Sequence, residues 1–339
     1  MFSKFQQQTI NYAANSPQQG NIPAGGMLCE FEGLLTMQPT ITGANNIAAN
    51  TLRGDEFGVI QSIQIKGESA LPIFDIPGST LKWQALLMDN AGVPLEIPTG
   101  LADGATANPS ISTAFRLPFW ATRAGKPYDS AYDNTAEPNG LTVTVNWLDA
   151  TKVNNTCASG LAGFTTPPSL AFYTTETAAN QHPFLRKRRY WGQYTFNANG
   201  PQRFQLEPGP AYRQFLINTR NNAGSDQASM FDIARLYVGG QQRQVTHEQV
   251  LGQVTRQRIG INAANTVVTK NTIESLKANY LWNLTTDGYL TNAANTLNQQ
   301  GNYIEFNILT NPCTVTVVYE VLEDLRNPAF GGLKPVRAA

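Results

Sequence analysis

The sequence is poor in charged residues, and this shortage argues against a protein built to attract nucleic acid. Charged side chains make up 14% of the 339 residues, against roughly 25% in a typical soluble domain. Lysine and arginine together equal aspartate and glutamate, so the net charge is zero. Without a basic excess, no general attraction to nucleic acid or to an anionic membrane is expected. We therefore predict no specific nucleic-acid partner.

Histidine is also scarce, which argues against most catalytic and metal sites. Only two are present: His182, which precedes Pro183, and His247, which lies in a helix-capping pattern. Neither has a cysteine, a histidine or a carboxylate at the spacing of metal ligands. The nucleophile elbow Gly-x-Ser-x-Gly, the glycine-rich phosphate loops and the calcium loop are absent from the sequence as well. The prediction is no catalytic residue, no metal and no cofactor, in a chain that is not an enzyme.

Three cysteines, Cys29, Cys157 and Cys313, are too few and too far apart for a disulfide framework. Cys29 and Cys313 lie inside strand patterns, which predicts buried thiols. The N-terminus has no apolar segment typical of a signal peptide, and no run of about 18 apolar residues occurs. We therefore expect a chain made in the cytoplasm and without a transmembrane helix.

The few charges that cluster are expected to face solvent. We interpret the densest basic run, Arg186–Arg189, as a solvated strand end, with contact to phosphate or to a neighbouring subunit as the alternative. A glycosidase would need two carboxylates about 5–10 Å apart across a cleft, and we instead expect the neighbouring carboxylates to be solvated. They lie at two places: Asp129 with Asp133, and Glu320 with Glu323 and Asp324.

The sequence is rich in segments with the alternating pattern of β-strands, and two of these segments each have a similar counterpart later in the chain. Cys313–Tyr319 alternates between two faces, as a half-buried strand does, and matches Leu141–Trp147 position by position. Upstream, Val59–Gly67 aligns with Ile233–Gly240, glycine on glycine at the end of each segment. The offset between the members is almost the same in both pairs. Two matches in the same order, at nearly equal offsets, indicate two similar β domains.

The predicted fold class is all-β, with two tandem eight-stranded antiparallel jelly rolls and a few short loop helices. Short strands separated by long connections indicate antiparallel sandwiches, and about eight strands per domain is the jelly-roll number. Helices are expected after Ser79 or Thr80, after the capping box Thr246–Gln249, and after Asn271. The predicted division is an N-terminal arm (1–26), the first roll with its connection (27–180), the second roll (181–326) and a C-terminal tail (327–339).

The N-terminal arm is rich in amide side chains and shows no sustained period. Phe2, Phe5 and Ile10, together with Lys4, are expected to form one amphipathic turn that docks on a neighbouring subunit or on a lipid surface. Phe2, Lys4 and Phe5 are accordingly the candidate contact residues. The alternative is a frayed terminus.

The repeat, the length and the missing catalytic motifs together resemble the double jelly-roll major capsid proteins. This lineage includes tailless icosahedral phages with an internal membrane and the adenovirus hexon. The resemblance covers about residues 27–327. The resemblance rests on the two paired segments described above, together with Arg213–Arg220, which is similar to the second roll of that family.

The resemblance implies a viral major capsid protein, of a bacteriophage, that forms homotrimers. Two rolls in each of three subunits give a pseudo-hexagonal capsomer, a shape that tiles an icosahedral shell. The implied partners are the chain itself, neighbouring capsomers, penton and minor capsid proteins, and an internal lipid membrane beneath the shell. The implied location is the virion, after synthesis in the host cytoplasm.

Two other classes of function remain open. Jelly rolls also occur in glycan-binding or receptor-binding proteins, such as spikes and adhesins, where loops and exposed aromatic residues hold a glycan. An enzyme on a β-sandwich is the third class. The strand pattern of Leu170–Thr175 within the connection favours the capsid hypothesis, because a pair of lectin domains more often has a flexible linker.

Overall fold

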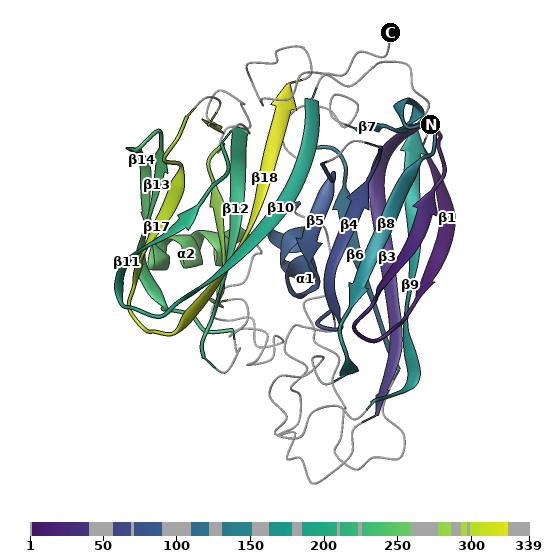
Figure 1. The fold of residues 1–339 in the computed structure, drawn as a ribbon, viewed down its shortest axis with the longest axis horizontal. Coiled ribbons are helices and arrows are strands. Elements are labelled where there is room, and N and C mark those ends of the chain that lie inside the picture. Colours follow the sequence, from purple (N-terminus) through teal and green to yellow (C-terminus); the bar gives the residue numbers. More distant parts are fainter. Residues whose placement is uncertain are drawn as a thin grey trace. The chain divides into compact units, whose positions relative to one another are not determined.

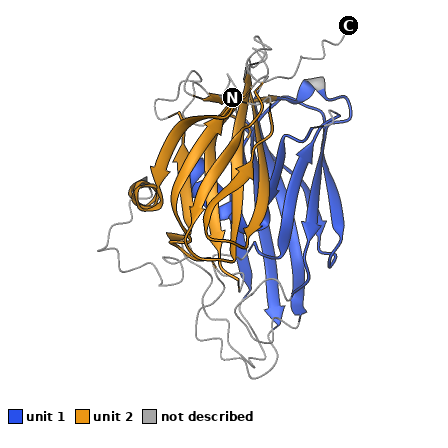
Figure 2. Cartoon of the chain, turned by 60° about the vertical axis from the view of Figure 1, so that its left-hand side comes forward, with its two compact units in different colours: residues 1–118, 133–179, 263–276 blue, residues 119–132, 180–262, 277–339 orange. Residues whose placement is uncertain are grey.

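The computed structural model consists mainly of antiparallel strands (Figure 1). Its contacts divide the chain into two compact units, which are coloured separately in Figure 2. Unit 1 comprises residues 1–118, 133–179 and 263–276, and unit 2 comprises the remainder. The structure describes residues 2–40, 57–68, 71–89, 110–121, 131–150, 163–177, 185–208, 211–222, 226–258, 277–285, 293–296 and 299–324.

Unit 1 has two sheets of four main strands. Its strands are β1 (Phe2–Asn11), β2 (Pro17–Ile22), β3 (Met27–Thr40), β4 (Ile60–Lys66), β5 (Phe74–Pro77), β6 (Ile111–Pro118), β8 (Leu141–Trp147) and β9 (Gly163–Thr177). One sheet has the order β1-β9-β3-β6, and the other has the order β2-β8-β4-β5. Every one of these pairings is antiparallel. The two-residue strand β7 (Tyr132–Asp133) lies between β6 and β8 in the chain.

Unit 2 is built in the same way. Its strands are β10 (Leu185–Phe196), β11 (Gly200–Gln205), β12 (Ala211–Arg220), β13 (Phe231–Val238), β14 (Gln241–His247), β15 (Asn279–Asn283), β17 (Tyr303–Ile308) and β18 (Cys313–Asp324). One sheet has the order β10-β18-β12-β15, and the other has the order β11-β17-β13-β14. The short strand β16 (Ala294–Asn295) pairs with β12.

Both units are jelly rolls with identical strand order. When the eight main strands of each unit are numbered along the chain, one sheet reads 1-8-3-6 and the other reads 2-7-4-5. This arrangement is two antiparallel sheets of a double-sheet jelly roll. The predicted fold class is therefore confirmed, down to eight strands in each roll.

Alternating burial along the strands explains how each roll encloses a core. Buried and half-buried residues alternate along β3, so one of its faces lies inside the roll. In unit 1, Phe31 stacks on Phe172 with ring centroids 5.4 Å apart. In unit 2, Phe231 meets Phe306 edge-on at 5.3 Å. A side chain at Gly33 would run into the ring of Phe115, so glycine is required at that close approach.

A helical segment follows the fifth strand in each roll (Figure 1). In unit 1 it consists of η1 (Gly78–Thr80), α1 (Leu81–Trp83) and η2 (Gln84–Met88), and in unit 2 it is α2 (Glu248–Arg258). A further short turn is η4 (Asn134–Ala136). The short loop helices are thus confirmed at two of the three expected places, and the third, after Asn271, lies outside the described residues.

The predicted caps are wrong. Thr80 makes no side-chain cap, because its hydroxyl donates to the carbonyl of Pro77 at 3.1 Å. Helix α2 begins at Glu248, two residues after the expected cap residue Thr246. The carboxylate of Glu248 instead accepts a hydrogen bond from the hydroxyl of Tyr280, at 2.6 Å. At Thr80 another local bond has replaced the cap, whereas at Glu248 the partner is a tertiary contact.

The N-terminal arm, expected over residues 1–26, is wrong. Strands β1 and β2 occupy this stretch and are the first two strands of the first roll. β1 pairs with β9, from Phe2 opposite Thr177 to Asn11 opposite Ser169. The sequence shows no period here because β1 is exposed along most of its length, so neither face needs apolar residues. The C-terminal tail (327–339) lies outside the described residues.

One of the two repeat alignments is also wrong. Val59–Gly67 and Ile233–Gly240 do correspond, since they contain β4 and β13, the fourth strands of their rolls. Leu141–Trp147 is β8, a seventh strand, whereas Cys313–Tyr319 begins β18, an eighth strand. The counterpart of β8 is β17. Any half-buried strand shows the same alternation, so this match indicated the strand type and not its position in the roll.

Cys29 and Cys313 are buried free thiols, as predicted. Burial raises the pKa of the Cys313 thiol to about 12. Burial, together with the nearby Glu30 and Glu176, raises the pKa of Cys29 to about 11. Cys157 lies outside the described residues.

Within the part of the chain that the structure describes, no helix has the length and apolar character needed to cross a bilayer.

Candidate functional sites: a buried charge cluster and two open strand edges

The histidines and carboxylates considered as possible catalytic or metal-binding residues do not gather in one place among the described residues. Among the described residues, no group of three or more histidines, cysteines or carboxylates could hold a metal ion. His247, at the end of β14, has its Nδ1 atom 3.6 Å from Oδ1 of Asp232, and both side chains are about half exposed. Solvent screens such a pair, so it is a weak surface contact. His182 and Asp129 lie outside the described residues.

The basic run Arg186–Arg189 begins β10, and its interpretation as a solvated strand end is wrong. Lys187, Arg188 and Arg189 are all buried. The antiparallel pairing of β10 with β18 places Arg189 directly opposite Glu320. The guanidinium of Arg189 donates from Nη2 to Oε2 of Glu320 at 2.5 Å. Glu320 is itself fully buried, so this is an ion pair in the interior.

Two further cations reach the same carboxylate, and we call the four residues the Glu320 cluster. From β12, Nη1 of Arg213 donates to Oε1 of Glu320. Arg213 lies where the register of β12 against β18 shifts, between Tyr212 and Gln214. From β10, Nζ of Lys187 lies 3.9 Å from Oε2. One buried carboxylate therefore joins three cations from two flanking strands.

A second ion pair lies three residues further along β18. Nε of Arg188 is 3.1 Å from Oε1 of Glu323. Successive residues of a strand point to opposite faces, so Arg188 and Glu323 point away from the face that carries Arg189 and Glu320. The structure therefore keeps Glu320 and Glu323 apart. Both are buried, and the expectation that they are solvated is wrong.

The pKa values of Glu320 and Glu323 are shifted in opposite directions. Burial alone would raise the pKa of Glu320, but Arg213, Arg189 and Lys187 together lower it well below its usual value. For Glu323, burial outweighs the attraction of Arg188 and Arg186, and its pKa is raised. A general acid or base needs a pKa near the working pH and access to its substrate. The Glu320 cluster is buried and fixed in charge, and its ion pairs connect β10, β18 and β12.

Sequence reasoning missed the Glu320 cluster because its members are far apart. Arg189 and Arg213 precede Glu320 by 131 and 107 residues. The available signal was a single charge, Glu320, inside the otherwise apolar run Val317–Leu322. A lone charge in such a strand must be paired when it is buried. That reasoning predicts a cationic partner but does not say which one.

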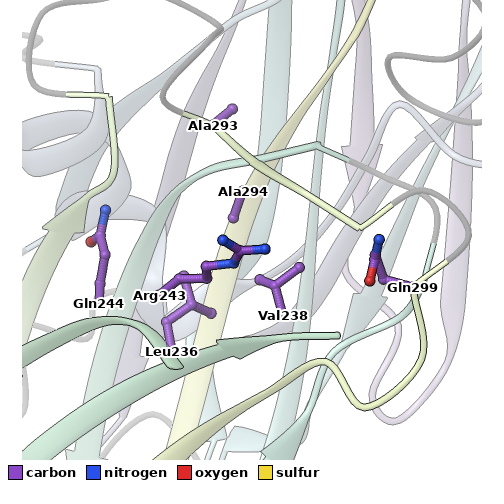
Figure 3. Close-up of a pocket in the computed structure, with 7 residues that line it drawn as sticks. All are labelled: Leu236, Val238, Arg243, Gln244, Ala293, Ala294 and Gln299. Carbon is purple, nitrogen blue, oxygen red and sulfur yellow. The ribbon is translucent and has the colours of Figure 1, made fainter. Parts of the chain in front are cut away.

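A hollow with a volume of about 290 Å³ lies in unit 2 (Figure 3). Its lining comes from β13, β14 and three residues between β15 and β17. Among the described lining residues, Arg243 is the one ionisable side chain, and it lies beside Leu236 and Val238. The lining residues are Leu236, Val238, Arg243, Gln244, Ala293, Ala294 and Gln299. This set offers no acid–base pair and no nucleophile.

The N-terminal candidate residues lie on β1, and not on the expected amphipathic turn. Nζ of Lys4 forms an ion pair with Glu32 of β3, and it also lies 5.4 Å from the ring centroid of Tyr173. Phe5 is opposite Thr174 of β9 and is 48% exposed. Lys4 is therefore engaged within its own roll, whereas Phe5 leaves an aromatic ring open to solvent.

Several sheet edges are protected against pairing with another chain. The hydroxyl of Thr255 on α2 accepts a hydrogen bond from the backbone N–H of Leu281 on β15, at 3.0 Å. Oε1 of Gln8 likewise accepts from the N–H of Asn21 on β2, at 2.9 Å. β6 ends in Pro118, and β11 has Pro201 as its second residue. Proline and covered amides are common protections of an edge strand.

The strands β1 and β14 lack these protections. Neither contains a proline, and each has a single lysine or arginine, Lys4 in β1 and Arg243 in β14. Each ends its sheet, and most of its side chains are exposed. Exposed edge strands of this kind are surfaces on which chains associate. We call β1 and β14 the two open edges.

Two jelly rolls of identical order in one chain define the double jelly-roll fold, and solved structures with this fold resemble the chain over nearly its whole length. The MCP of STIV (Sulfolobus Turreted Icosahedral Virus) has a TM-score of 0.74 at 11% identity, covering 98% of this chain and 100% of its own. The major capsid protein P2 from bacteriophage PM2 has a TM-score of 0.57 at 11% identity, covering 95% and 97%.

The PBCV-1 virus capsid is a third similar structure, with a TM-score of 0.64 at 11% identity, covering 95% of this chain and 93% of that one. The TM-scores establish a common fold, and identities this low leave function to be argued separately. No protein-family model and no curated protein sequence matches the chain. The chain is thus a double jelly roll, and the three similar structures named here are of viral capsids or their major capsid proteins.

Proposed function

We propose that the chain is a viral major capsid protein that forms homotrimeric, pseudo-hexagonal capsomers and assembles into an icosahedral shell. The observation that carries the proposal is the pair of rolls with identical strand order. Three such chains supply six similar rolls, which suit a six-sided tile. The likeness to capsid proteins over at least 95% of the chain supports the same role. The virus is a bacteriophage in this proposal, as PM2 is by its name.

The proposed partners follow from that role. They are further copies of the chain, neighbouring capsomers, penton and minor capsid proteins, and an internal lipid membrane, and they do not include a specific nucleic acid. The protein would be made in the host cytoplasm and reside in the virion. Of the N-terminal candidates Phe2, Lys4 and Phe5, the exposed ring of Phe5 favours contact with a neighbouring subunit.

The alternative of glycan binding finds less support. A glycan platform needs several aromatic rings together at the surface, and the exposed rings Phe5 and Tyr194 belong to different units. Two of the strand tryptophans, Trp147 and Trp282, are buried in their rolls. Trp282 additionally donates its indole N–H to Gln244 at 3.1 Å. These rings are therefore committed to the core of the protein.

The native mass of the purified chain tests the proposal. The mass of one chain is 37.0 kDa, and we expect light scattering to give three times this value over a wide range of concentration. At high concentration we expect larger shells or sheets, visible by electron microscopy. A protein that keeps the mass of a single chain at every concentration would contradict the proposal, and a glycan array would then be the next measurement.

A further inference from the structure

The first strands of the two rolls differ in exposure although they occupy the same place. β1 and β10 each pair with the last strand of their own roll, β9 and β18. In β10, Lys187, Arg188 and Arg189 are buried. In β1, the side chains of Ser3 to Gln6 are all exposed. The beginning of this strand is therefore covered in the second roll and open in the first.

The fifth strand and its helix show the reverse pattern. In unit 1, β5 is mostly buried, and all eight side chains of 81–88 are buried. In unit 2, β14 is almost entirely exposed. On α2, Val250 and Val254 are 52% and 49% exposed, and their spacing of four residues places them on one face of the helix. Here the position is covered in the first roll and open in the second.

The two open positions are also alike in chemistry. Seven large apolar side chains are exposed among the described residues, and four of them lie on β1, β14 or α2. These four are Phe5, Val245, Val250 and Val254. Glutamine is the commonest polar residue on all three elements, with three copies on each. Amide side chains both donate and accept hydrogen bonds, so two such surfaces complement each other without charge.

We propose that β1 of one chain packs against β14 and α2 of a second copy of the chain, in a head-to-tail contact. One surface is the position that the first roll leaves open, and the other is the position that the second roll leaves open. They include the two open edges. A contact between two different surfaces of identical chains is heterologous, and it closes into a ring when the rotation permits. This inference rests on the proposed capsid function, because it names the subunit contact of the proposed trimer.

Two variants test the contact from its two sides. The double variant Val250→Lys/Val254→Lys places two charges on α2, and Phe5→Lys places one on β1. Leu309→Lys is the matched control, because Leu309 is 50% exposed and lies outside both surfaces. We expect each test variant to raise the concentration for half-dissociation of the trimer about tenfold or more, measured by sedimentation. The control should leave this concentration unchanged.

Circular dichroism and thermal melting will establish that all three variants fold as the wild type does. Trimers as stable as the wild type in both folded test variants would overturn the inference and leave the proposed function standing. A wild type that is monomeric at every concentration would instead refute the proposed function. The two failures are therefore distinguishable.

Mixing the two test variants distinguishes a head-to-tail contact from a symmetric one. The α2 variant retains an intact β1, and the β1 variant retains an intact α2. A head-to-tail contact therefore yields, only in the mixture, a complex of two chains with twice the mass of one chain, which sedimentation measures. A symmetric contact would produce the dimer in one variant alone, and that result would overturn the inference.

Discussion

At the scale of the single residue, Glu320 is the carboxylate that forms ion pairs with the most cations among the described residues. It is fully buried, and it is the shared partner of Lys187, Arg189 and Arg213. Burying a cation without a partner is costly, whereas a pair with good geometry largely offsets that cost. The removal of this carboxylate would therefore take a buried anionic partner from three cations. Stability should consequently depend on Glu320 far more than on a surface charge.

We predict that Glu320→Gln lowers the free energy of unfolding at neutral pH by about 3 to 5 kcal/mol, the usual cost of breaking a buried pair. Chemical denaturation of wild type and variant measures the difference. Because the pKa of Glu320 is lowered in the fold, its charge stabilises the protein above the unfolded-state pKa of about 4.3, and this stabilisation is lost as the pH falls below that value. The difference should therefore shrink on acidification.

Glu323→Gln is the matched control on the same strand. The pKa of Glu323 is raised by burial, so its contribution is greatest at low pH and declines as the pH rises through the folded-state pKa. Its substitution should cost less than Glu320→Gln at neutral pH, and the cost should not shrink on acidification. Equal costs and equal pH profiles for the two variants would contradict our account of the Glu320 cluster.

At the scale of the element, α2 covers part of the edge strand β15 on one side and exposes apolar side chains to solvent on the other. Its inner side is fastened to β15 through Glu248, which accepts from Tyr280, and Thr255, which accepts from the N–H of Leu281. Its outer side exposes Val250 and Val254. The helix thus satisfies a backbone group that would otherwise lie at the edge of the sheet, and it presents apolar surface outward.

We predict that Thr255→Val destabilises the protein by about 1 to 3 kcal/mol, the cost of leaving a buried N–H without an acceptor. Valine keeps the shape of threonine, so the loss isolates the hydrogen bond to Leu281. Thermal denaturation and hydrogen exchange at Leu281 would measure it. Thr195→Val is the control, because the hydroxyl of Thr195 bonds that of Thr314 at the exposed surface. A Thr255→Val effect no larger than that of the control would refute the proposed fastening.

At the scale of the whole molecule, low charge and many amide groups suit a surface that copies of the chain cover. Charged residues make up 14% of the chain and the net charge is zero. The proposed contact surfaces contain mostly glutamine and exposed apolar side chains. Such interfaces gain little from long-range attraction. Many weak contacts repeated over a shell supply the stability instead.

We predict that salt has little effect on the trimer. Raising sodium chloride from about 0.1 to 1 M shortens the screening length from about 10 to 3 Å, which weakens exposed ion pairs and leaves apolar contacts intact. The concentration for half-dissociation should change no more than about threefold, as measured by sedimentation. A rise of more than about tenfold would show that exposed ion pairs hold the subunits together, contrary to the proposed contact.

The fold could be predicted from local pattern, and the candidate site could not. Alternation and turn-forming residues indicated strands such as β8 and β18, and the expected pair of eight-stranded rolls is present. The strand β1 was missed because a strand that is exposed on both faces has no apolar period. The Glu320 cluster was missed because its partners are brought together by strand pairing.

The sequence by itself determined that the chain forms two all-β domains, because alternation with period two and the placement of turns are properties of neighbouring residues. Only the tertiary structure decided which strands are neighbours, since a seventh and an eighth strand have the same local pattern. It also decided that Arg189 and Glu320 are buried together. Whether a charge faces water or a partner depends on a strand more than a hundred residues away.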